Sequence, residues 1–182
     1  MSASALPHMT ADEFIAWTTA QPKGARYELV DGEIYAMASQ RSSHALAAFR
    51  IARRLAEGVE AAGLDCTVYA DGMAVEIDAT TVYEPDAIVR RGPQLPGDAV
   101  RVSDPLIVVE VLSPSTRAVD TGLKLAGYFR IASLRHYLVV RAEARTVVHH
   151  ARDESGAIST RIIRDGPLTL EPPGIELRDL FG

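Results

Sequence analysis

Residues 105–124 read PLIVVEVLSPSTRAVDTGLK. The first eight are almost entirely apolar, which predicts a strand buried on both faces of a sheet. The remainder predicts a helix capped by Ser115 or Thr116. Glu110 interrupts the apolar run. Burying a carboxylate in a strand costs free energy unless a partner or a cation compensates its charge. We therefore expect Glu110 to have a charged neighbour.

Working outward, the sequence predicts an α/β fold in which a mixed β-sheet is flanked by helices. Thr10 and Glu13 form a capping-box pattern that starts a first helix. Asp31-Gly32 and Asp71-Gly72 each indicate a β-hairpin. A long helix is expected over 43–62, with Gly63 ending it. Strands are expected at EPDAIVRR, RHYLVVRA, RTVVHHAR and ISTRIIR, and the strands 105–112 and 135–140 should be parallel because a helix connects them. Leu177, Leu180 and Phe181 are expected to close the core.

Composition narrows the class of protein. The 182 residues fit one domain, 1–182, with 1–9 expected as a flexible N-terminal segment. The net charge of −5 argues against broad, sequence-blind binding to phosphate. Cys66 is the only cysteine, so an internal disulfide and a cysteine-based zinc site are excluded. We see no signal peptide and no apolar run of membrane-spanning length, and we expect a cytoplasmic protein.

Two acidic residues on neighbouring predicted strands suggest a metal site. Asp86 follows Pro85 at the start of one apolar strand, and Glu110 lies in the next. Two nearby carboxylates repel, and a divalent cation removes that penalty. Oxygen ligands without His or Cys favour Mg²⁺ or Mn²⁺ over zinc. Such a metal activates water and stabilises charge on a phosphoryl oxygen.

Lys124 stands out because only Lys23 and Lys124 are lysines, and every other permanently cationic side chain is arginine. Its helix begins just beyond the strand that carries Glu110, so the ammonium group could fold back over that strand. Beside a metal-bound water it would orient the nucleophile or neutralise charge in the transition state.

The segments YELVDGE, EPDAIV and VVEVLSPSTRAVDTGLKLAGY resemble the PD-(D/E)XK nuclease superfamily, and within it the Uma family catalogued under restriction endonucleases. The resemblance runs from about Met9 to Phe181. It implies a restriction-endonuclease-like core in which Asp86 and Glu110 bind Mg²⁺ or Mn²⁺, and the carbonyl of Val111 adds a ligand. The usual lysine position holds Leu112, and the resemblance implies that the lysine has moved to Lys124. Glu28 takes the place of the accessory acid.

Each of these residues has a simpler explanation as well. Asp86 could cap a turn, Glu110 could pair with Arg90, Lys124 could form a surface pair with Asp120, and Glu28 could be a hydrogen-bonding hairpin residue. Substrate phosphates could be held by Arg117, which starts the lysine helix, or by Arg90. Tyr128 could line the cleft or belong to the core, and His44 could face the site or be exposed.

The sequence leaves two functions open, one as an enzyme and one as a binding module. The first is a Mg²⁺-dependent endonuclease that hydrolyses phosphodiester bonds in nucleic acid, expected to be DNA, and that works as a homodimer because cutting two strands needs two sites. The second is a nuclease fold kept as a nucleic-acid or protein-binding module without turnover.

His149 and His150 are adjacent in a predicted strand. Their side chains should therefore point to opposite faces of the sheet, and they cannot bind one metal together.

Overall fold

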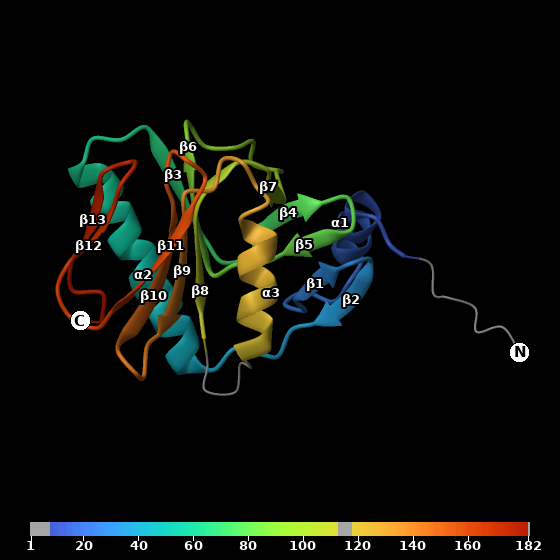
Figure 1. The fold of residues 1–182 in the computed structure, drawn as a ribbon. Coiled ribbons are helices and arrows are strands. Elements are labelled where there is room, and N and C mark those ends of the chain that lie inside the picture. Colours follow the sequence, from blue (N-terminus) through green and yellow to red (C-terminus); the bar gives the residue numbers. More distant parts are fainter. Residues whose placement is uncertain (1–7, 113–117, 182) are drawn as a thin grey trace, which may run out of the picture.

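The computed structural model describes residues 8–112 and 118–181, with 118–121 described by their backbone alone. Its ribbon is shown in Figure 1. The described helices are α1 (Ala11–Thr19), α2 (Ser42–Ala61) and α3 (Ala118–Tyr128). Thr10 forms the predicted capping box with Glu13, and Gly63 lies just beyond α2 with a φ of 61°. The caps proposed for the third helix, Ser115 and Thr116, lie outside the described residues.

A six-stranded sheet forms the centre of the molecule, in the order β11-β10-β9-β8-β6-β3. Its strands in chain order are β3 (Cys66–Ala70), β6 (Ala87–Arg91), β8 (Pro105–Val111), β9 (His136–Arg141), β10 (Thr146–Arg152) and β11 (Ile158–Ile163). The β8 and β9 strands are parallel, as predicted, and the other neighbours are antiparallel. The sheet is therefore mixed, and α3 makes the crossover from β8 to β9.

A second, five-stranded sheet has the order β2-β1-β5-β4-β7. It consists of β1 (Tyr27–Val30), β2 (Glu33–Ala36), β4 (Ala74–Asp78), β5 (Thr81–Tyr83) and β7 (Arg101–Val102). The hairpin of β1 and β2 turns at Asp31-Gly32, as predicted, with both residues at positive φ. A separate hairpin is formed by β12 (Leu168–Leu170) and β13 (Ile175–Leu177).

The second predicted hairpin is wrong. Asp71 and Gly72 do have positive φ values, 38° and 84°, so the turn itself is present. The strands that it joins belong to different sheets, because β3 pairs with β6 whereas β4 pairs with β5 and β7. The amide of Asp71 donates to the carbonyl of Asp86, 3.0 Å away. The turn thus carries the chain from one sheet to the other, beside Asp86.

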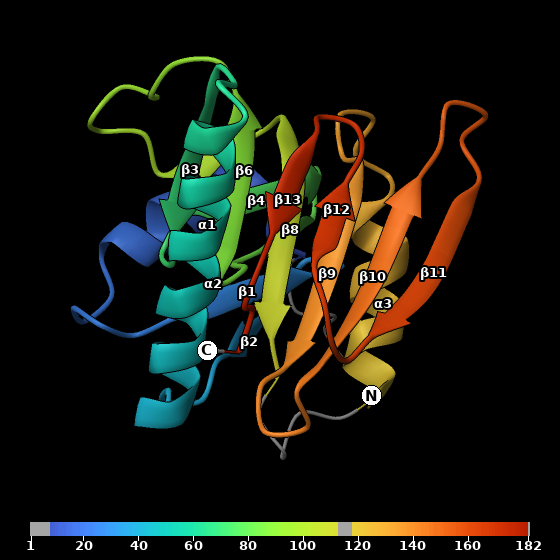
Figure 2. The same cartoon turned by 90° about the vertical axis from the view of Figure 1, so that its left-hand side faces the viewer.

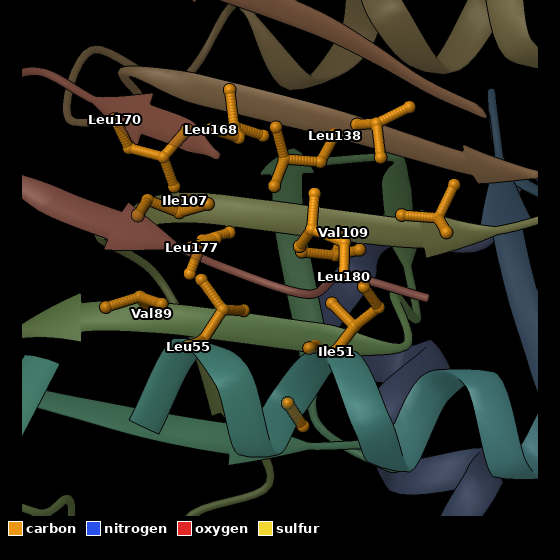
Figure 3. Packing of buried hydrophobic residues seen from close by; sticks show 14 of the residues in the cluster. Ile51, Leu55, Val89, Ile107, Val109, Leu138, Leu168, Leu170, Leu177 and Leu180 are labelled. Atoms are coloured by element: carbon orange, nitrogen blue, oxygen red, sulfur yellow. The ribbon is translucent and has the colours of Figure 1, made fainter. Parts of the chain in front are cut away.

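Each face of the six-stranded sheet is covered by a different layer. On one face α2 and the β12–β13 hairpin pack against β6, β8 and β9 through Ile51, Leu55, Val89, Ile107, Val109, Leu138, Leu168 and Leu177 (Figure 3). Figure 2 shows this layer from the front. Leu177, Leu180 and Phe181 join this core, as expected. On the other face lie α3 and part of the five-stranded sheet, packed through Tyr83, Ile88, Val108, Tyr128 and Tyr137.

Two smaller points complete the fold. Most of the predicted flexible segment, 1–9, lies outside the described residues, but His8 and Met9 bond to the carbonyls of Asp31 and Gly32. None of the helices in the described ranges is both long enough and apolar enough to cross a membrane.

Candidate active site

Glu110 lies in β8, all seven residues of which are buried. Its side chain is on the α3 face of the sheet with Val108, whereas Val109 and Val111 face α2. The carboxylate oxygen Oε1 accepts hydrogen bonds from the Tyr128 hydroxyl at 2.7 Å and from Lys124 Nζ at 3.0 Å. The partners that Glu110 requires therefore come from α3.

Lys124 joins two strands through its ammonium group. Nζ donates to Glu28 Oε1 at 2.7 Å as well as to Glu110, and it lies 5.4 Å from the centre of the Tyr83 ring. Burial lowers the pKa of Lys124, but the carboxylates of Glu110 and Glu28 outweigh burial and the net shift is upward. With 6% of its surface exposed, Lys124 is not the surface lysine that a simple pair with Asp120 would require.

Glu28 is held on β1 by two different bonds to the same oxygen. Besides the Lys124 ammonium, Oε1 accepts from the backbone amide of Glu84 at 3.0 Å. The residue is buried. Glu28 is thus both a hydrogen-bonding hairpin residue and a member of the buried acidic cluster.

Asp86 lies immediately before β6 and is tied to the end of β8. Its backbone amide donates to the Val109 carbonyl at 2.9 Å, and its Oδ2 accepts from the Val111 amide at 2.7 Å. Its other oxygen, Oδ1, is 2.8 Å from His44 Nε2. Asp86 therefore bonds across the sheet and to α2, rather than only capping a turn after Pro85.

The three carboxylates influence one another. Burial raises the pKa of Glu110, Lys124 opposes that shift, and the charges of Glu28 and Asp86 add to it, so that the pKa reaches about 7. The pKa of the Tyr128 phenol is raised further above its ordinary value by burial and by Glu110. The cluster thus contains a carboxyl group that exchanges its proton near neutral pH and a phenol that stays protonated as a donor.

His44 is brought to the cluster by the first turn of α2. Its hydrogen bond to Asp86 raises the pKa of the imidazole, although burial acts in the opposite direction. From the sequence alone, His44 could be exposed or could face the site. The structure places it against Asp86, with 15% of its side chain exposed.

An adjoining ion-pair group was not found from the sequence. Arg26 Nε donates to Glu84 Oε1 at 2.8 Å, and Arg26 Nη2 lies 2.8 Å from Asp71 Oδ1. These partners are separated by tens of residues in the chain, so no spacing rule connects them. Counting both groups, five carboxylates (Glu28, Asp71, Glu84, Asp86 and Glu110) face two permanent cations, Arg26 and Lys124.

The remaining predicted substrate contacts fall in different places. Tyr128 is fully buried, and its hydroxyl bonds Glu110, so it belongs to the core and to the cluster at once. Arg90 does not join the cluster, because it lies at the far end of β6 and pairs with Asp104 at 2.7 Å and with the Pro93 carbonyl. Arg117 lies outside the described residues.

The donor atoms fit a magnesium-type ion better than zinc. In residues 8–112 and 118–181, no three His, Cys, Asp or Glu side chains converge as a self-sufficient metal centre. Mg²⁺ does not need one, because it binds through one or two carboxylates and keeps several waters. Asp86, Glu110 and the Val111 carbonyl offer oxygen atoms near one end of β8, and Glu28 bonds Lys124 beside them.

His149 and His150 point to opposite faces of β10, as predicted. His149 bonds His136, and His150 stacks on Tyr137.

Comparison with known proteins agrees with this fold. The chain resembles an uncharacterised protein, slr1290, of Synechocystis sp., with 29% identity over 150 residues that cover 81% of this chain and 77% of that protein. The fold of the present chain matches a crystal structure described as a "putative nuclease" of DUF820 from Anabaena variabilis. The TM-score is 0.73, with 13% identity, and the match covers 95% of this chain and 97% of that one. The profile of the Uma2 family, described as "Putative restriction endonuclease", matches residues 11–179, and the chain belongs to that family.

Proposed function

We propose that the protein is a metal-dependent endonuclease that hydrolyses phosphodiester bonds in DNA, using Mg²⁺ or Mn²⁺. The observation that carries the proposal is the charge balance of the buried cluster. The Lys124 ammonium bonds Glu28 and Glu110, the charge of Asp86 adds to the raised pKa of Glu110, and each of the three carboxylates is at most 8% exposed. Surplus negative charge in a buried site is costly, and a divalent cation offsets it. Nuclease chemistry is supported by the family, which is described by that activity.

Asp86, Glu110 and the Val111 carbonyl would hold the metal. When bound, such an ion lowers the pKa of water and stabilises negative charge on phosphoryl oxygens. The hydrogen bonds from the Val111 amide and His44 to Asp86 hold that carboxylate in one orientation. The Tyr128 hydroxyl fixes the orientation of the Glu110 carboxyl group in the same way.

Lys124 would act as a cation and hydrogen-bond donor rather than as a base. Its pKa is raised by Glu110 and Glu28 against the effect of burial, so it holds its proton at neutral pH. An ammonium group in this position orients an attacking water and compensates charge that develops on the phosphate. The proton of the water must therefore leave by way of another group or bulk solvent.

The test is nicking of supercoiled plasmid and cleavage of single-stranded DNA in Mg²⁺, in Mn²⁺ and in chelator. Four variants accompany the wild type: Asp86→Asn and Lys124→Met in the cluster, and Glu143→Gln and Lys23→Met as matched controls on the exposed surface. We expect metal-dependent cleavage that the first two substitutions lower at least about 100-fold and the controls leave unchanged. Circular dichroism establishes that each variant is folded.

Three outcomes would change the assignment. Cleavage that survives Lys124→Met would remove the lysine from the chemistry and leave the metal ligands. Cleavage that survives Asp86→Asn would place the active site elsewhere. No cleavage by the wild type, together with no Mn²⁺ binding in calorimetry, would support the alternative of a binding module without turnover.

For a duplex substrate the proposal includes a homodimer, since two strands need two sites. Sedimentation velocity with and without duplex DNA tests this assembly. A monomer that nicks only one strand would remove the dimer without affecting the chemistry of each site.

A further inference from the structure

Tyr35 lies beside the buried acidic cluster but takes no part in it. In the antiparallel pair of β1 and β2, Tyr35 is directly opposite Glu28. Residues opposite each other in such a pair project their side chains from the same face of the sheet. The face of the hairpin that supplies Glu28 to Lys124 therefore carries the tyrosine as well.

The ring of Tyr35 is open to solvent. Every residue of β2 is exposed, and Tyr35 has 52% of its surface accessible. Its hydroxyl donates to Glu33 Oε2 at 3.0 Å, two residues away on the same face, so the far end of the ring is held. An aromatic side chain that is held at its hydroxyl and exposed over its ring can stack on another flat group. Among the residues that the structure describes, no aromatic side chain stacks on Tyr35.

We propose that Tyr35 is a specificity-determining residue whose ring stacks on an unpaired base next to the phosphate bound at the Glu28–Lys124–Glu110 cluster. This inference rests on the proposed nuclease function and narrows it to a substrate class. Bases inside a continuous duplex already have both faces covered by their neighbours, whereas an unpaired base offers a free face to an aromatic ring. The site should therefore prefer single-stranded or locally unpaired DNA.

The geometry favours a base over an apolar protein segment. Glu33 is exposed on the same face and accepts the Tyr35 hydroxyl, so a charged side chain and not an apolar one borders the ring. A base stacks through its π-face and leaves its polar edges hydrated. A hydrophobic peptide would have to cover the Glu33 carboxylate.

The first test measures binding without relying on cleavage. Fluorescence anisotropy compares a phosphorothioate-linked single strand with the matching duplex, in Mn²⁺. We expect Tyr35→Ala to weaken single-strand binding by about tenfold and to leave duplex binding unchanged, because base–aromatic stacking contributes about 1–3 kcal/mol for each base. Tyr35→Phe keeps the ring and should bind like the wild type. Ile162→Ala, which removes a 65% exposed side chain from β11, is the control.

A second test reads stacking directly. Tyr35→Trp places an indole on β2, and we expect its fluorescence to be quenched by the single strand and not by the duplex. The wild type, whose single tryptophan Trp17 packs edge-on against Tyr27, supplies the background signal. Single-strand binding that is equal in the wild type and Tyr35→Ala, or an unquenched indole, overturns the role of Tyr35 and leaves the nuclease proposal standing. A wild type that binds neither DNA form overturns both.

Discussion

The carboxyl group of Glu110 makes the stability of the protein depend on pH. Burial raises its pKa, against the effect of Lys124, to about 7, whereas in the unfolded chain the value is the ordinary 4.5. Between these values the folded state binds more protons than the unfolded state. The free energy of unfolding therefore falls as the pH rises from about 4.5 to about 7.

Glu110→Gln removes this titration. We expect urea unfolding of the variant to lose less stability than the wild type between about pH 5 and about pH 8. Mn²⁺ should stabilise the wild type more at the higher pH, because the ion competes with the proton for the carboxylate. Parallel curves for the two proteins would mean that Glu110 titrates at its ordinary value.

A buried histidine pair acts in the opposite direction. The Pro172 carbonyl can only accept, so His136 Nε2 donates to it at 2.6 Å. His136 Nδ1 must then accept from His149 Nε2 at 2.9 Å, and His149 Nδ1 accepts from Arg161. This chain of bonds requires both rings to be neutral. Burial, with the nearby His136 and Arg161, lowers the pKa of His149 to about 3.

The unfolded chain binds a proton at His149 near pH 6.5, and the folded chain does so only near pH 3. Stability contributed by the neutral ring is present above about pH 6.5 and is lost as the pH falls towards 3. We expect His149→Gln to be less stable than the wild type at neutral pH and to show a shallower acid-induced loss. An acid branch of the unfolding curve that is unchanged in the variant would contradict the assignment.

At the scale of the element, the position of α3 depends on one glycine. A Cβ at Gly127 would lie 2.8 Å from Tyr83 Cε2 and 2.9 Å from its hydroxyl oxygen. Tyr83 is buried and packs edge-on against Tyr128, so it cannot move aside easily. The absence of a side chain at Gly127 lets α3 approach the five-stranded sheet closely enough for Lys124 to reach Glu28.

Gly127→Ala should therefore destabilise the protein by about 1–3 kcal/mol and lower cleavage, because it displaces Lys124 and Tyr128 together. Gly122→Ala is the matched control on the same helix, since a Cβ there meets nothing within 4 Å. That change should raise stability by up to about 1 kcal/mol through helix propensity. Thermal unfolding of both variants makes the comparison. Equal changes in melting temperature for the two variants would show that Tyr83 moves away from the added methyl group without loss of stability.

The elements that the sequence could predict are those with local signals. The capping box at Thr10, the turn at Asp31-Gly32 and the apolar run of β8 each depend on residues close in the chain, and all three are present. The sequence also predicts the turn at Asp71-Gly72, but the hairpin pairing expected of its two strands is wrong. A turn dipeptide specifies backbone dihedral angles, and it does not specify which strand each arm will bond.

The same limit applies to the candidate site. Asp86 and Glu110 could be brought together because they lie on consecutive strands, and Lys124 because its helix follows directly. The bond from His44 to Asp86 spans 42 residues and that from Arg26 to Glu84 spans 58. Contacts of that separation are set by how α2 and the second sheet pack on the central one. The hydrophobic periodicity of the sequence indicates helices and strands, but it does not indicate how these layers pack on one another.

At the scale of the whole molecule, charge opposes the proposed substrate. The chain has a net charge of −5, and within it the candidate site holds five carboxylates against two permanent cations. A phosphate backbone that approaches this site meets repulsion unless a cation is present. Divalent metal should thus be required for DNA binding as well as for cleavage.

We therefore expect binding of a phosphorothioate-linked oligonucleotide to strengthen at least about tenfold when Mn²⁺ replaces chelator, with anisotropy as the measurement. In Mn²⁺ the dependence on monovalent salt should be shallow, because Arg26 beside the cluster is already paired with Asp71 and Glu84 and is not available to displace counterions from the DNA backbone. Asp86→Asn, which removes one proposed ligand, should reduce the gain from Mn²⁺. Glu143→Gln should keep the gain, because that carboxylate is exposed in the turn between β9 and β10, outside the cluster. Tight binding in chelator with a steep salt dependence would instead point to a basic DNA-binding surface away from the acidic cluster, and would separate recognition of DNA from the metal.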